Sequence, residues 1–587
     1  MTMHRERQAG FSLLEIIIGM GVLVIVSSAI YLAYANTLDI VSAGQYYSAA
    51  ANIVESEVEI IRNMRYEDLG TVGGIPNGVL EPEKTVTLNQ TEFTVLTFVR
   101  NIDDPFDGTL GGVPDDTDPA DYKLVEIQVV CDMCARFTEI SMTTTIAPRN
   151  LESPDLSGNL IVQVYDALGQ PLPGATITVN NTSVTPVINL TDTSDENGQL
   201  SLVGVPSSSA GYRITVSRVG YSTDRTYPPD EPSNPNPTKP DVTVAEEQLT
   251  FASFAIDRTA SFTLSAVDAL CSPVSAMDLL VTGDKLIGTS PDIPKYSVAH
   301  ATSADGTVSL PAVEWGSYAL QPSDTSYAVA ATSLSSPVIL DPDDSLSLTW
   351  YVTSQNPSSL LVTVTDDTGA PVNDAVVRVS SGSVDETVMS GRFDWSQNDW
   401  TGGQFSGSSG INTASGGVLT LAGSPGSYAT GSYAWLESET IDFGATTTFY
   451  DVDWDPSSQP AETGPESVRF QVAANNDQAT WNYVGPDGTA GTFFSSPGTS
   501  LPGSLSGNRF VRYRLEMRTE DADTTPSVTN VSLRYRSTCL PGGGAYFSGL
   551  PYGMYTVSVT GTSFQDYIAT DIPVLADWQE YPTILEP

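Results

Sequence analysis

A cluster of aspartates on a loop between two predicted strands is the first group of side chains in this 587-residue chain that could bind a metal ion. Carboxylate oxygens on short loops suit Ca²⁺, which takes about six to eight oxygen ligands. The candidate ligands are Asp103, Asp104, Asp107, Asp118 and Asp121. A solvated acidic loop with Asx turns is the alternative interpretation. No cofactor is expected to be required, and Ca²⁺ is the only candidate.

Tryptophan and arginine concentrate in the segment 393–537. It holds five of the chain's eight tryptophans, namely Trp395, Trp400, Trp435, Trp454 and Trp481. Strand-like alternation places Arg512 and Arg514 on one face of a predicted strand, and a second alternating strand exposes Arg534 in the same way. Arginine and tryptophan are frequent at binding hot spots. The segment is therefore a candidate site for an anionic ligand such as a surface glycan, with exposed tryptophans as stacking platforms.

Pairing within the sheet is the alternative role for these arginines. A further predicted strand alternates carboxylates with Val452 and Trp454, and cross-strand ion pairs could engage the arginines. The carboxylates are Asp451, Asp453 and Asp455. Sequence alone leaves both interpretations open.

Four cysteines offer redox or metal chemistry. The spacing of Cys131 and Cys134 fits either half a zinc site or a disulfide across a tight hairpin, and no second CxxC or histidine pair completes a zinc site. We therefore expect a disulfide between them. Cys271 and Cys539 are either free or joined across domains, and the sequence does not choose between these states.

Composition disfavours catalysis and nucleic-acid binding. The chain has two histidines, His4 and His300, whereas a Ser-His-Asp triad needs a histidine base and an HExxH zinc site needs a pair. No carboxylate pair lies in a recognisable motif. The formal charge of -45, from 25 basic and 70 acidic residues, repels phosphate backbones. We expect neither an enzyme nor a nucleic-acid partner.

A hydrophobic N-terminal segment is predicted to span a membrane once. The uncharged run from Ile16 to Leu38 would rise on the order of 35 Å as a helix, enough to cross a hydrocarbon core of about 30 Å. Arg5 and Arg7 precede the run, and Asp39 follows it. The positive-inside tendency therefore predicts a single-pass plasma (inner) membrane protein with a cytoplasmic N-terminus and an extracytoplasmic bulk.

The order GFSLLE at residues 10–15 resembles the cleavage and methylation motif of type IV prepilins. The resemblance implies that a prepilin peptidase cuts after Gly10 and methylates Phe11. It also implies that Glu15 pairs with the amino terminus of a neighbouring pilin subunit, because an unpaired carboxylate in lipid is costly. Many members of this family have a helix-kinking proline in the hydrophobic run, whereas this chain has none before Pro76.

A long helix and a small sheet are predicted next. Apolar residues recur at three- and four-residue intervals, so one helix should run to about Arg65. Strand-like alternation then occurs at 85–89, 92–99, 124–130 and 137–144. These strands are consistent with the antiparallel sheet that covers the helix in pilins.

Three later segments repeat, with starts near Leu160, Ser261 and Leu360. Each has a strand, an Asp-containing turn and a second strand. They resemble carboxypeptidase regulatory-like and collagen-adhesin B-type domains, which implies immunoglobulin-like β-sandwiches used mainly as stalks. The third repeat is split by the segment 393–537, and this insert resembles lectin-like jelly rolls.

The predicted fold is mainly β, with a long N-terminal transmembrane helix, a pilin-like antiparallel sheet, tandem immunoglobulin-like β-sandwiches and one inserted jelly-roll-like β domain. The predicted boundaries are 1–10 for the leader, 11–66 for the helix with its span at about 11–38, 67–150 for the β head, 155–257 and 258–352 for the first two repeats, 358–392 with 538–587 for the third, and 393–537 for the insert.

The predicted function is that of a large minor type IV pilin-like protein, which assembles through its N-terminal helix and displays β-sandwiches for adhesion at the cell surface. Its predicted partners are other pilin subunits, prepilin peptidase, membrane lipid and a surface glycan. A pseudopilin of a type II-like secretion system is one alternative. A carbohydrate-active enzyme on a pilin anchor is the other.

Overall fold

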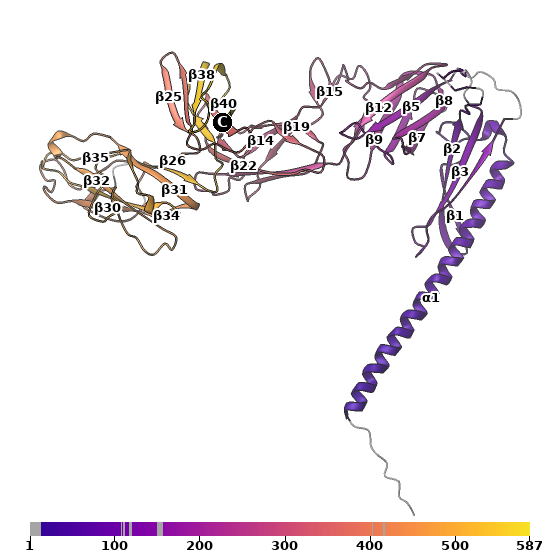
Figure 1. Cartoon of the computed structure of the whole chain (residues 1–587), viewed down its shortest axis with the longest axis horizontal. Helices are drawn as coiled ribbons and strands as arrows, with labels where there is room; N and C mark the ends of the chain where they lie inside the picture. Colours follow the sequence, from indigo (N-terminus) through magenta and orange to yellow (C-terminus); the bar gives the residue numbers. More distant parts are fainter. Residues whose placement is uncertain are drawn as a thin grey trace, which may run out of the picture. The chain divides into compact units, whose positions relative to one another are not determined.

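The computed structural model describes residues 13–106, 108–109, 112–114, 116, 120–148, 157–401, 403–414 and 417–587. One long helix precedes many β-strands (Figure 1), so the predicted mainly-β fold class is confirmed. The chain divides into two compact units. The first is Met1–Asp257 with Ile287–Ile293, and the second is Arg258–Leu286 with Pro294–Pro587.

Helix α1 spans Leu13–Arg62 without interruption, and the short 3₁₀ helix η1 (Tyr66–Asp68) follows it. No proline removes a backbone donor from this stretch, so its hydrogen-bond ladder runs unbroken. The helix lies against a four-stranded antiparallel sheet of order β1-β2-β3-β4. Its strands are β1 (Glu83–Leu88), β2 (Thr91–Ile102), β3 (Tyr122–Val130) and β4 (Ile140–Ile146).

Period-two alternation in β2 and β3 turns one face of this sheet toward α1. The buried strand residues share a core with the last five turns of the helix. Core residues include Phe93, Val95, Val125, Ile127 and Val129 from the strands, and Ala50, Ile53, Val54, Val58 and Ile61 from the helix. This sheet and the C-terminal part of α1 form the head.

The first repeat is a two-layer β-sandwich. One layer has the order β12-β5-β8, and the other has β10-β9-β6-β7 with β11 on β9. Its strands are β5 (Ser157–Tyr165), β6 (Thr176–Asn181), β7 (Ile188–Thr193), β8 (Gln199–Pro206), β9 (Ser208–Ser217), β10 (Asp224–Arg225), β11 (Val242–Val244) and β12 (Leu249–Ala255).

The second repeat has layers of order β18-β13-β22-β20 and β17-β14-β19-β21. Its strands are β13 (Ala260–Val267), β14 (Asp278–Gly283), β17 (Ser297–Ala301), β18 (Thr307–Val313), β19 (Gly316–Pro322), β20 (Tyr327–Thr332), β21 (Val338–Leu340) and β22 (Ser345–Ser354). The small hairpin between β14 and β17 consists of β15 (Leu286–Gly288) and β16 (Ile293–Pro294).

The third repeat combines chain segments from both sides of the insert. Its layers have the orders β37-β23-β40 and β25-β24-β38-β39. Its strands are β23 (Ser359–Asp366), β24 (Val376–Ser381), β25 (Val384–Met389), β37 (Gly544–Phe547), β38 (Gly553–Thr560), β39 (Tyr567–Val574) and β40 (Trp578–Leu585).

The three repeats share local structure as well as topology. In each one the first strand pairs in parallel with the last strand and antiparallel with another. An aspartate at the end of the first strand, or directly after it, accepts hydrogen bonds from the backbone N–H groups two and four residues later and forms an Asx turn. These aspartates are Asp166, Asp268 and Asp366. The aspartate that recurs in the sequence repeat therefore stabilises the backbone of this turn.

The insert is built from an antiparallel sheet of order β26-β36-β31-β34-β30-β27, in which β32 also pairs with β34 and β33 with β31. Its strands are β26 (Phe393–Gln397), β27 (Phe405–Ser409), β28 (Ile411–Asn412), β29 (Leu419–Leu421), β30 (Ala434–Ser438), β31 (Ile441–Asp455), β32 (Val468–Asn475), β33 (Thr499–Ser500), β34 (Asn508–Met517), β35 (Ser527–Val528) and β36 (Asn530–Ser537), with 3₁₀ helices η2 (Ala461–Thr463) and η3 (Gly503–Leu505). Strands β28, β29 and β35 form a second, smaller sheet.

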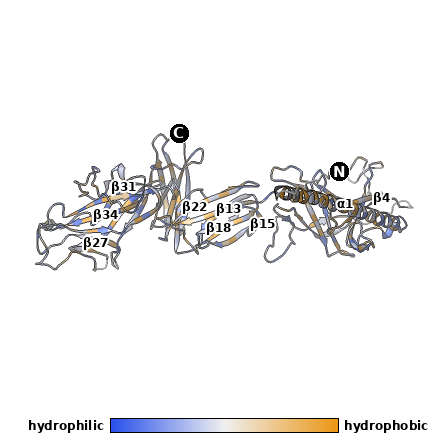
Figure 2. Ribbon diagram, turned by 90° about the horizontal axis from the view of Figure 1, so that it is seen from below, coloured by the Kyte–Doolittle hydropathy of each residue, from blue (hydrophilic) through white to orange (hydrophobic). Residues whose placement is uncertain are grey.

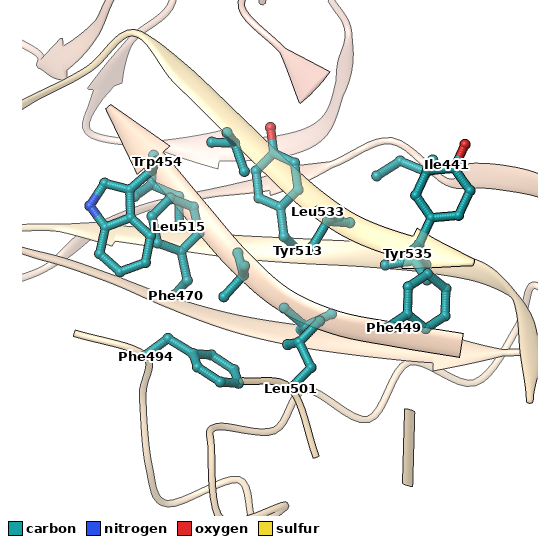
Figure 3. Packing of buried hydrophobic residues seen from close by; sticks show 14 of the residues in the cluster. Ile441, Phe449, Trp454, Phe470, Phe494, Leu501, Tyr513, Leu515, Leu533 and Tyr535 are labelled. Carbon is teal, nitrogen blue, oxygen red and sulfur yellow. The ribbon is translucent and has the colours of Figure 1, made fainter. Parts of the chain in front are cut away.

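The long strand β31 makes the insert a two-layer structure. Its first part pairs with β34 and its second part with β36, with a register shift in each pairing. The layer of β34, β30 and β32 thus packs across one apolar core from the layer of β26, β36 and the end of β31 (Figure 3). Trp454 and Phe470 meet there with ring centroids 4.7 Å apart.

The second compact unit joins the second repeat, the third repeat and the insert by specific contacts. Tyr351 of the second repeat packs edge-on against Phe393 of the insert, with ring centroids 4.9 Å apart. The Trp578 indole of the third repeat donates to the carbonyl of Val329 at 2.8 Å. A disulfide links Cys271 to Cys539, 268 residues apart in the sequence.

Candidate assembly helix and ligand-binding surfaces

The first part of α1 exposes its apolar side chains on all sides. Leu23 is 64% exposed, Ile30 65% and Tyr34 63%, and Ala43 is the first buried residue among the described side chains of the helix. Figure 2 shows the hydrophobic colouring of α1. Within the described residues, this is one helix long and apolar enough to cross a membrane. A helix that is apolar all round and has no partner in its own chain requires lipid or other helices around it.

The second part of α1 is fixed to the head by polar contacts as well as by the core. Glu57 and Lys84 form an ion pair at 2.7 Å. The Lys123 amine is buried and donates to the carbonyls of Tyr66 at 3.0 Å and Leu69 at 2.6 Å. Desolvation lowers the pKa of Lys123. This lysine therefore ties the segment after the helix to the sheet through carbonyl oxygens.

The predicted processing residues, Gly10 and Phe11, lie outside the described residues. The backbone of Glu15 is part of α1, but its side chain is outside the described set. The roles assigned to these three residues stay predictions from the sequence.

The acidic loop of the head brings together part of the predicted calcium set. Carboxylate oxygens of Asp103, Asp116 and Asp121 all lie within 4.8 Å of one another. The Asp121 carboxylate also accepts from the backbone N–H of Asp104. Asp107 and Asp118 are outside the described residues. The converging oxygens could supply some of the ligands of a calcium ion, with Asp116 as a member that the predicted set omitted.

Both cysteine pairs are disulfides in the structure. Cys131 and Cys134 are joined at the turn after β3, with their Cα atoms 5.5 Å apart. The Cys271–Cys539 bridge has a Cα separation of 6.2 Å. Spacing alone indicated the first bridge, whereas the second depends on how the insert packs against the second repeat.

Arg512 and Arg514 lie on the outer side of the β34 layer, where partners from the same chain engage them. Arg514 forms an ion pair with Glu437 and stacks over the Tyr483 ring at 4.3 Å. Arg512 donates to the Thr440 hydroxyl at 2.9 Å. Internal pairing thus accounts for both arginines.

The same outer side continues as alternating guanidinium groups and rings. Arg469 pairs with Glu516 at 2.6 Å, and its guanidinium lies 3.6 Å from the ring centroids of both Tyr433 and Phe493. Arg512 lies 4.5 Å from the Trp481 ring. We call this surface the arginine–aromatic layer, after its arginines 469, 512, 514 and 518.

Arg534 does not share this surface. It belongs to β36 in the opposite layer, where it contacts Asp394 at 3.3 Å and Asp451 at 3.4 Å. The expectation of one face containing Arg512, Arg514 and Arg534 is therefore wrong, because the inward side chains of the two strands meet in one core and their outward side chains point apart. Among the three aspartates proposed as partners, Asp451 alone pairs with an arginine in the described chain.

The expectation that the tryptophans of the insert are exposed stacking platforms is also partly wrong. Trp400 and Trp454 are only 1% and 3% exposed and belong to the insert core. Trp435 is on the surface, whereas Trp395 and Trp481 are partly buried. Alternation identifies which strand residues share a face, but Trp400 lies on a loop, and Trp454 faces inward like Val452.

Two segments of the chain match known family models. Residues 5–31 match the prokaryotic N-terminal methylation motif, and residues 159–256 match the carboxypeptidase regulatory-like domain. The second match coincides with the first β-sandwich repeat. No curated relative matches the chain.

Solved structures with some similarity include three surface proteins. The Bacillus anthracis TIE protein is 10% identical at a TM-score of 0.15, over 79% of this chain and 59% of that one. The streptococcal ancillary pilin is 14% identical at 0.17, over 38% and 75%. The shaft pilin SpaA of Lactobacillus rhamnosus GG is 12% identical at 0.14, over 34% and 100%. Values this low carry no argument about function.

The family matches coincide with two features already described, the exposed apolar helix at the N-terminus and the first β-sandwich. The chain carries a type IV prepilin-like N-terminal methylation motif and a carboxypeptidase regulatory-like domain.

Proposed function

We propose that this protein is a large minor pilin-like surface protein, which assembles through α1 and displays its β domains for adhesion. The observation that carries the proposal is the exposed apolar first part of α1 in a chain that bears the methylation motif. Such a surface is stable in lipid before assembly and among the helices of other pilin subunits afterwards.

Processing and assembly follow from the same segment. A prepilin peptidase would cleave after Gly10 and methylate Phe11, and Glu15 would pair with the new amino terminus of a neighbouring subunit. Arg5 and Arg7 would hold the leader on the cytoplasmic side of the membrane. The head stays folded during this transfer, because its core involves only the second part of α1.

Adhesion is assigned to the insert. The three repeats share one topology and close their apolar surfaces within sandwich cores, as expected of stalk modules. The insert departs from this pattern with a distinct architecture and a large share of the aromatic residues. Unique surfaces are better candidates for recognition than repeated ones.

The test is a deletion that leaves the stalk in place. We would join Gly391 to Thr538 through a short flexible linker, which removes the insert and retains every strand of the third repeat and Cys539. We expect sheared surface fibres to contain the deleted chain in normal amounts, while attachment to polysaccharide, mineral or host surfaces is lost.

Unchanged attachment by the deleted chain would refute the adhesive role of the insert. Absence of the wild-type chain from surface fibres, with recovery in short periplasmic filaments, would instead support the pseudopilin alternative. Electron microscopy with an antibody against the repeats distinguishes these outcomes.

A further inference from the structure

A cleft of about 730 Å³ lies within the second compact unit, where the second repeat meets the insert. One wall is the Asx turn after β13. The other walls are β26 with the loop that follows it, and the turn between β30 and β31. The volume falls within the range of about 300–1,000 Å³ that is typical of small-ligand pockets.

The wall from the second repeat is held rigidly. Asp268 accepts backbone hydrogen bonds from Leu270 at 2.8 Å and Ser272 at 2.9 Å. The disulfide from Cys271 to Cys539 ties the tip of this turn to the chain just beyond β36. The Tyr535 hydroxyl donates to the carbonyl of Ala269, next to the same tip. The turn is thus fastened to the insert through Tyr535 and to the segment just after the insert through Cys539.

The loop after β26 is anchored from within the core. The Gln397 amide group donates to the carbonyls of Asp399 at 3.2 Å and Gln404 at 3.1 Å, and its carbonyl accepts from the Tyr513 hydroxyl at 2.8 Å. The buried Trp400 indole donates to the same hydroxyl oxygen at 2.8 Å. A ligand would therefore meet chain positions at Asp399 and Gln404 that Gln397 already holds, which lowers the entropy cost of binding.

The cleft presents one aromatic ring with several polar groups. Trp395 packs one side against the insert core and lines the cleft. The side chains of Asn398, Gln404 and Glu439 also line it, and none of them has a hydrogen bond or ion pair to the described chain. Hydrogen-bonding groups without internal partners around an aromatic ring suit a ligand that has an apolar face and many hydroxyls.

Charge further restricts the ligand. Arg509 lines the cleft, but Asp442 binds it in a two-pronged ion pair at 2.6 Å and 2.9 Å. Asp399 and Glu439 leave an excess of negative charge. An anionic ligand would be repelled, whereas sugar hydroxyls would donate charge-assisted hydrogen bonds to these carboxylates.

We propose that this cleft binds a neutral oligosaccharide, with Trp395 stacking on a sugar ring and with Asn398, Gln404 and Glu439 bonding its hydroxyls. The inference rests on the adhesive function proposed above and names its site. It moves the ligand from the arginine–aromatic layer to the junction between the insert and the second repeat.

The test measures saccharide binding by the purified full-length chain in detergent. The probes are immobilised linear trisaccharides of glucose, galactose, mannose and N-acetylglucosamine, with a sialylated trisaccharide as the anionic comparison. We expect at least one neutral trisaccharide to bind and the sialylated one not to bind. Glu439→Ala and Gln404→Ala should each weaken binding tenfold or more, with folding retained because neither side chain has a hydrogen bond or ion pair to the described residues.

Two control variants separate the cleft from its surroundings. Glu462→Ala removes an exposed glutamate elsewhere in the insert, and Arg512→Gln alters the arginine–aromatic layer. Both should bind within threefold of wild type. The proposal is overturned if no neutral trisaccharide binds, if only the sialylated one binds, or if both cleft variants bind like wild type. None of these three results would contradict a loss of attachment on deleting the insert. The adhesive function and the proposed sugar site are therefore tested separately.

Discussion

The first part of α1 and the arginine–aromatic layer are both conspicuous in the sequence, yet their surroundings differ. The helix leaves residues such as Leu23 and Ile30 exposed without partners among the described residues. In the layer, Arg469 and Arg514 contact carboxylates and aromatic rings of the same chain. The described residues leave the first region without partners, whereas side chains of the same chain engage the arginines of the second.

This difference shows how an unusual sequence feature relates to function. A cluster of unusual residues indicates binding to another molecule only when its own fold leaves it without partners. The exposed helix meets this condition, as do the polar side chains of the cleft. The arginines do not, although arginine and tryptophan are common at binding hot spots.

The largest effect is expected for the helix. Glu15→Ala should reduce incorporation into sheared surface fibres tenfold or more, because the variant loses the partner of the neighbouring amino terminus. Membrane insertion should persist, since the span becomes more apolar. Quantitative immunoblotting of the fibre and membrane fractions measures both. Equal amounts of variant and wild type in fibres would contradict the prediction.

Glu580 is an intermediate case, because its carboxylate is enclosed and accepts hydrogen bonds but has no ion pair with a described cation. It accepts from the Ser336 N–H at 3.1 Å and the Thr363 hydroxyl at 3.3 Å. Desolvation raises its pKa to about 7, against 4.5 for the free side chain. The folded state therefore favours the protonated form of Glu580. The contribution of this group to the free energy of unfolding is lost as the pH rises from about 4.5 to about 7.

Glu580→Gln should remove this loss. Relative to wild type, the variant should gain on the order of 3 kcal/mol at pH 8 and little at pH 4. Hydrogen exchange of β40 amides across this pH range measures the difference. Glu586→Gln, at an exposed position on the same C-terminal segment, is the matched control and should follow wild type. A constant offset at every pH would show that burial of Glu580 is not the cause.

Two valines of α1 allow the exposed first part of the helix to be compared with the part packed in the head. Val54 is 1% exposed in the head core, whereas Val24 is 63% exposed. Val54→Ala should destabilise the head by about 2 kcal/mol, because it leaves a cavity. Val24→Ala should leave head stability unchanged. Hydrogen exchange of β2 and β3 amides compares them, and equal effects would mean that the exposed segment also supports the head.

Arginine substitutions should have smaller effects that follow burial. Arg469 and Glu516 have side chains 18% and 17% exposed, whereas Arg534 is 44% exposed. Arg469→Gln should cost about 1–2 kcal/mol and Arg534→Gln at most about 1 kcal/mol. Neither should affect attachment of cells. If either variant lost attachment while hydrogen exchange showed unchanged stability of the insert, the substituted arginine would be a ligand contact after all.

Calcium should have the smallest effect. If the carboxylates of Asp103, Asp116 and Asp121 bind the ion, a concentration several-fold above its Kd should stabilise the head by about 1 kcal/mol. Thermal unfolding of the head in millimolar calcium and in chelator measures the shift. Asp116→Asn should reduce it, and an equal melting temperature in both solutions would reject binding.

Local patterns in the sequence predicted much of the fold. Apolar spacing predicted one helix to about Arg65, and α1 ends at Arg62. Alternation predicted the β-rich remainder, and the shared Asp-containing turns placed repeat starts close to Ser157, Ala260 and Ser359. These signals are visible because strand and helix periodicities depend on neighbours in the sequence.

Contacts between distant segments could not be predicted in this way. Alternation shows that Arg514 and Arg534 point out of their strands, but not that the strands lie in opposite layers. The partner of Cys271 lies 268 residues away, so no local spacing indicates it. The cleft likewise depends on the packing of the insert against a turn in another repeat.

The Cys271–Cys539 bridge determines how the molecule would carry tension. A pull on a surface-bound insert would pass along β36 to Cys539, and then across the sulfur atoms to Cys271 and toward the membrane. The chain between these cysteines, which includes most strands of the second repeat and three of the third, would be bypassed. A covalent bond then bears the load in place of hydrogen-bonded strands, so the strands between the two cysteines would stay folded at forces that would otherwise unravel them.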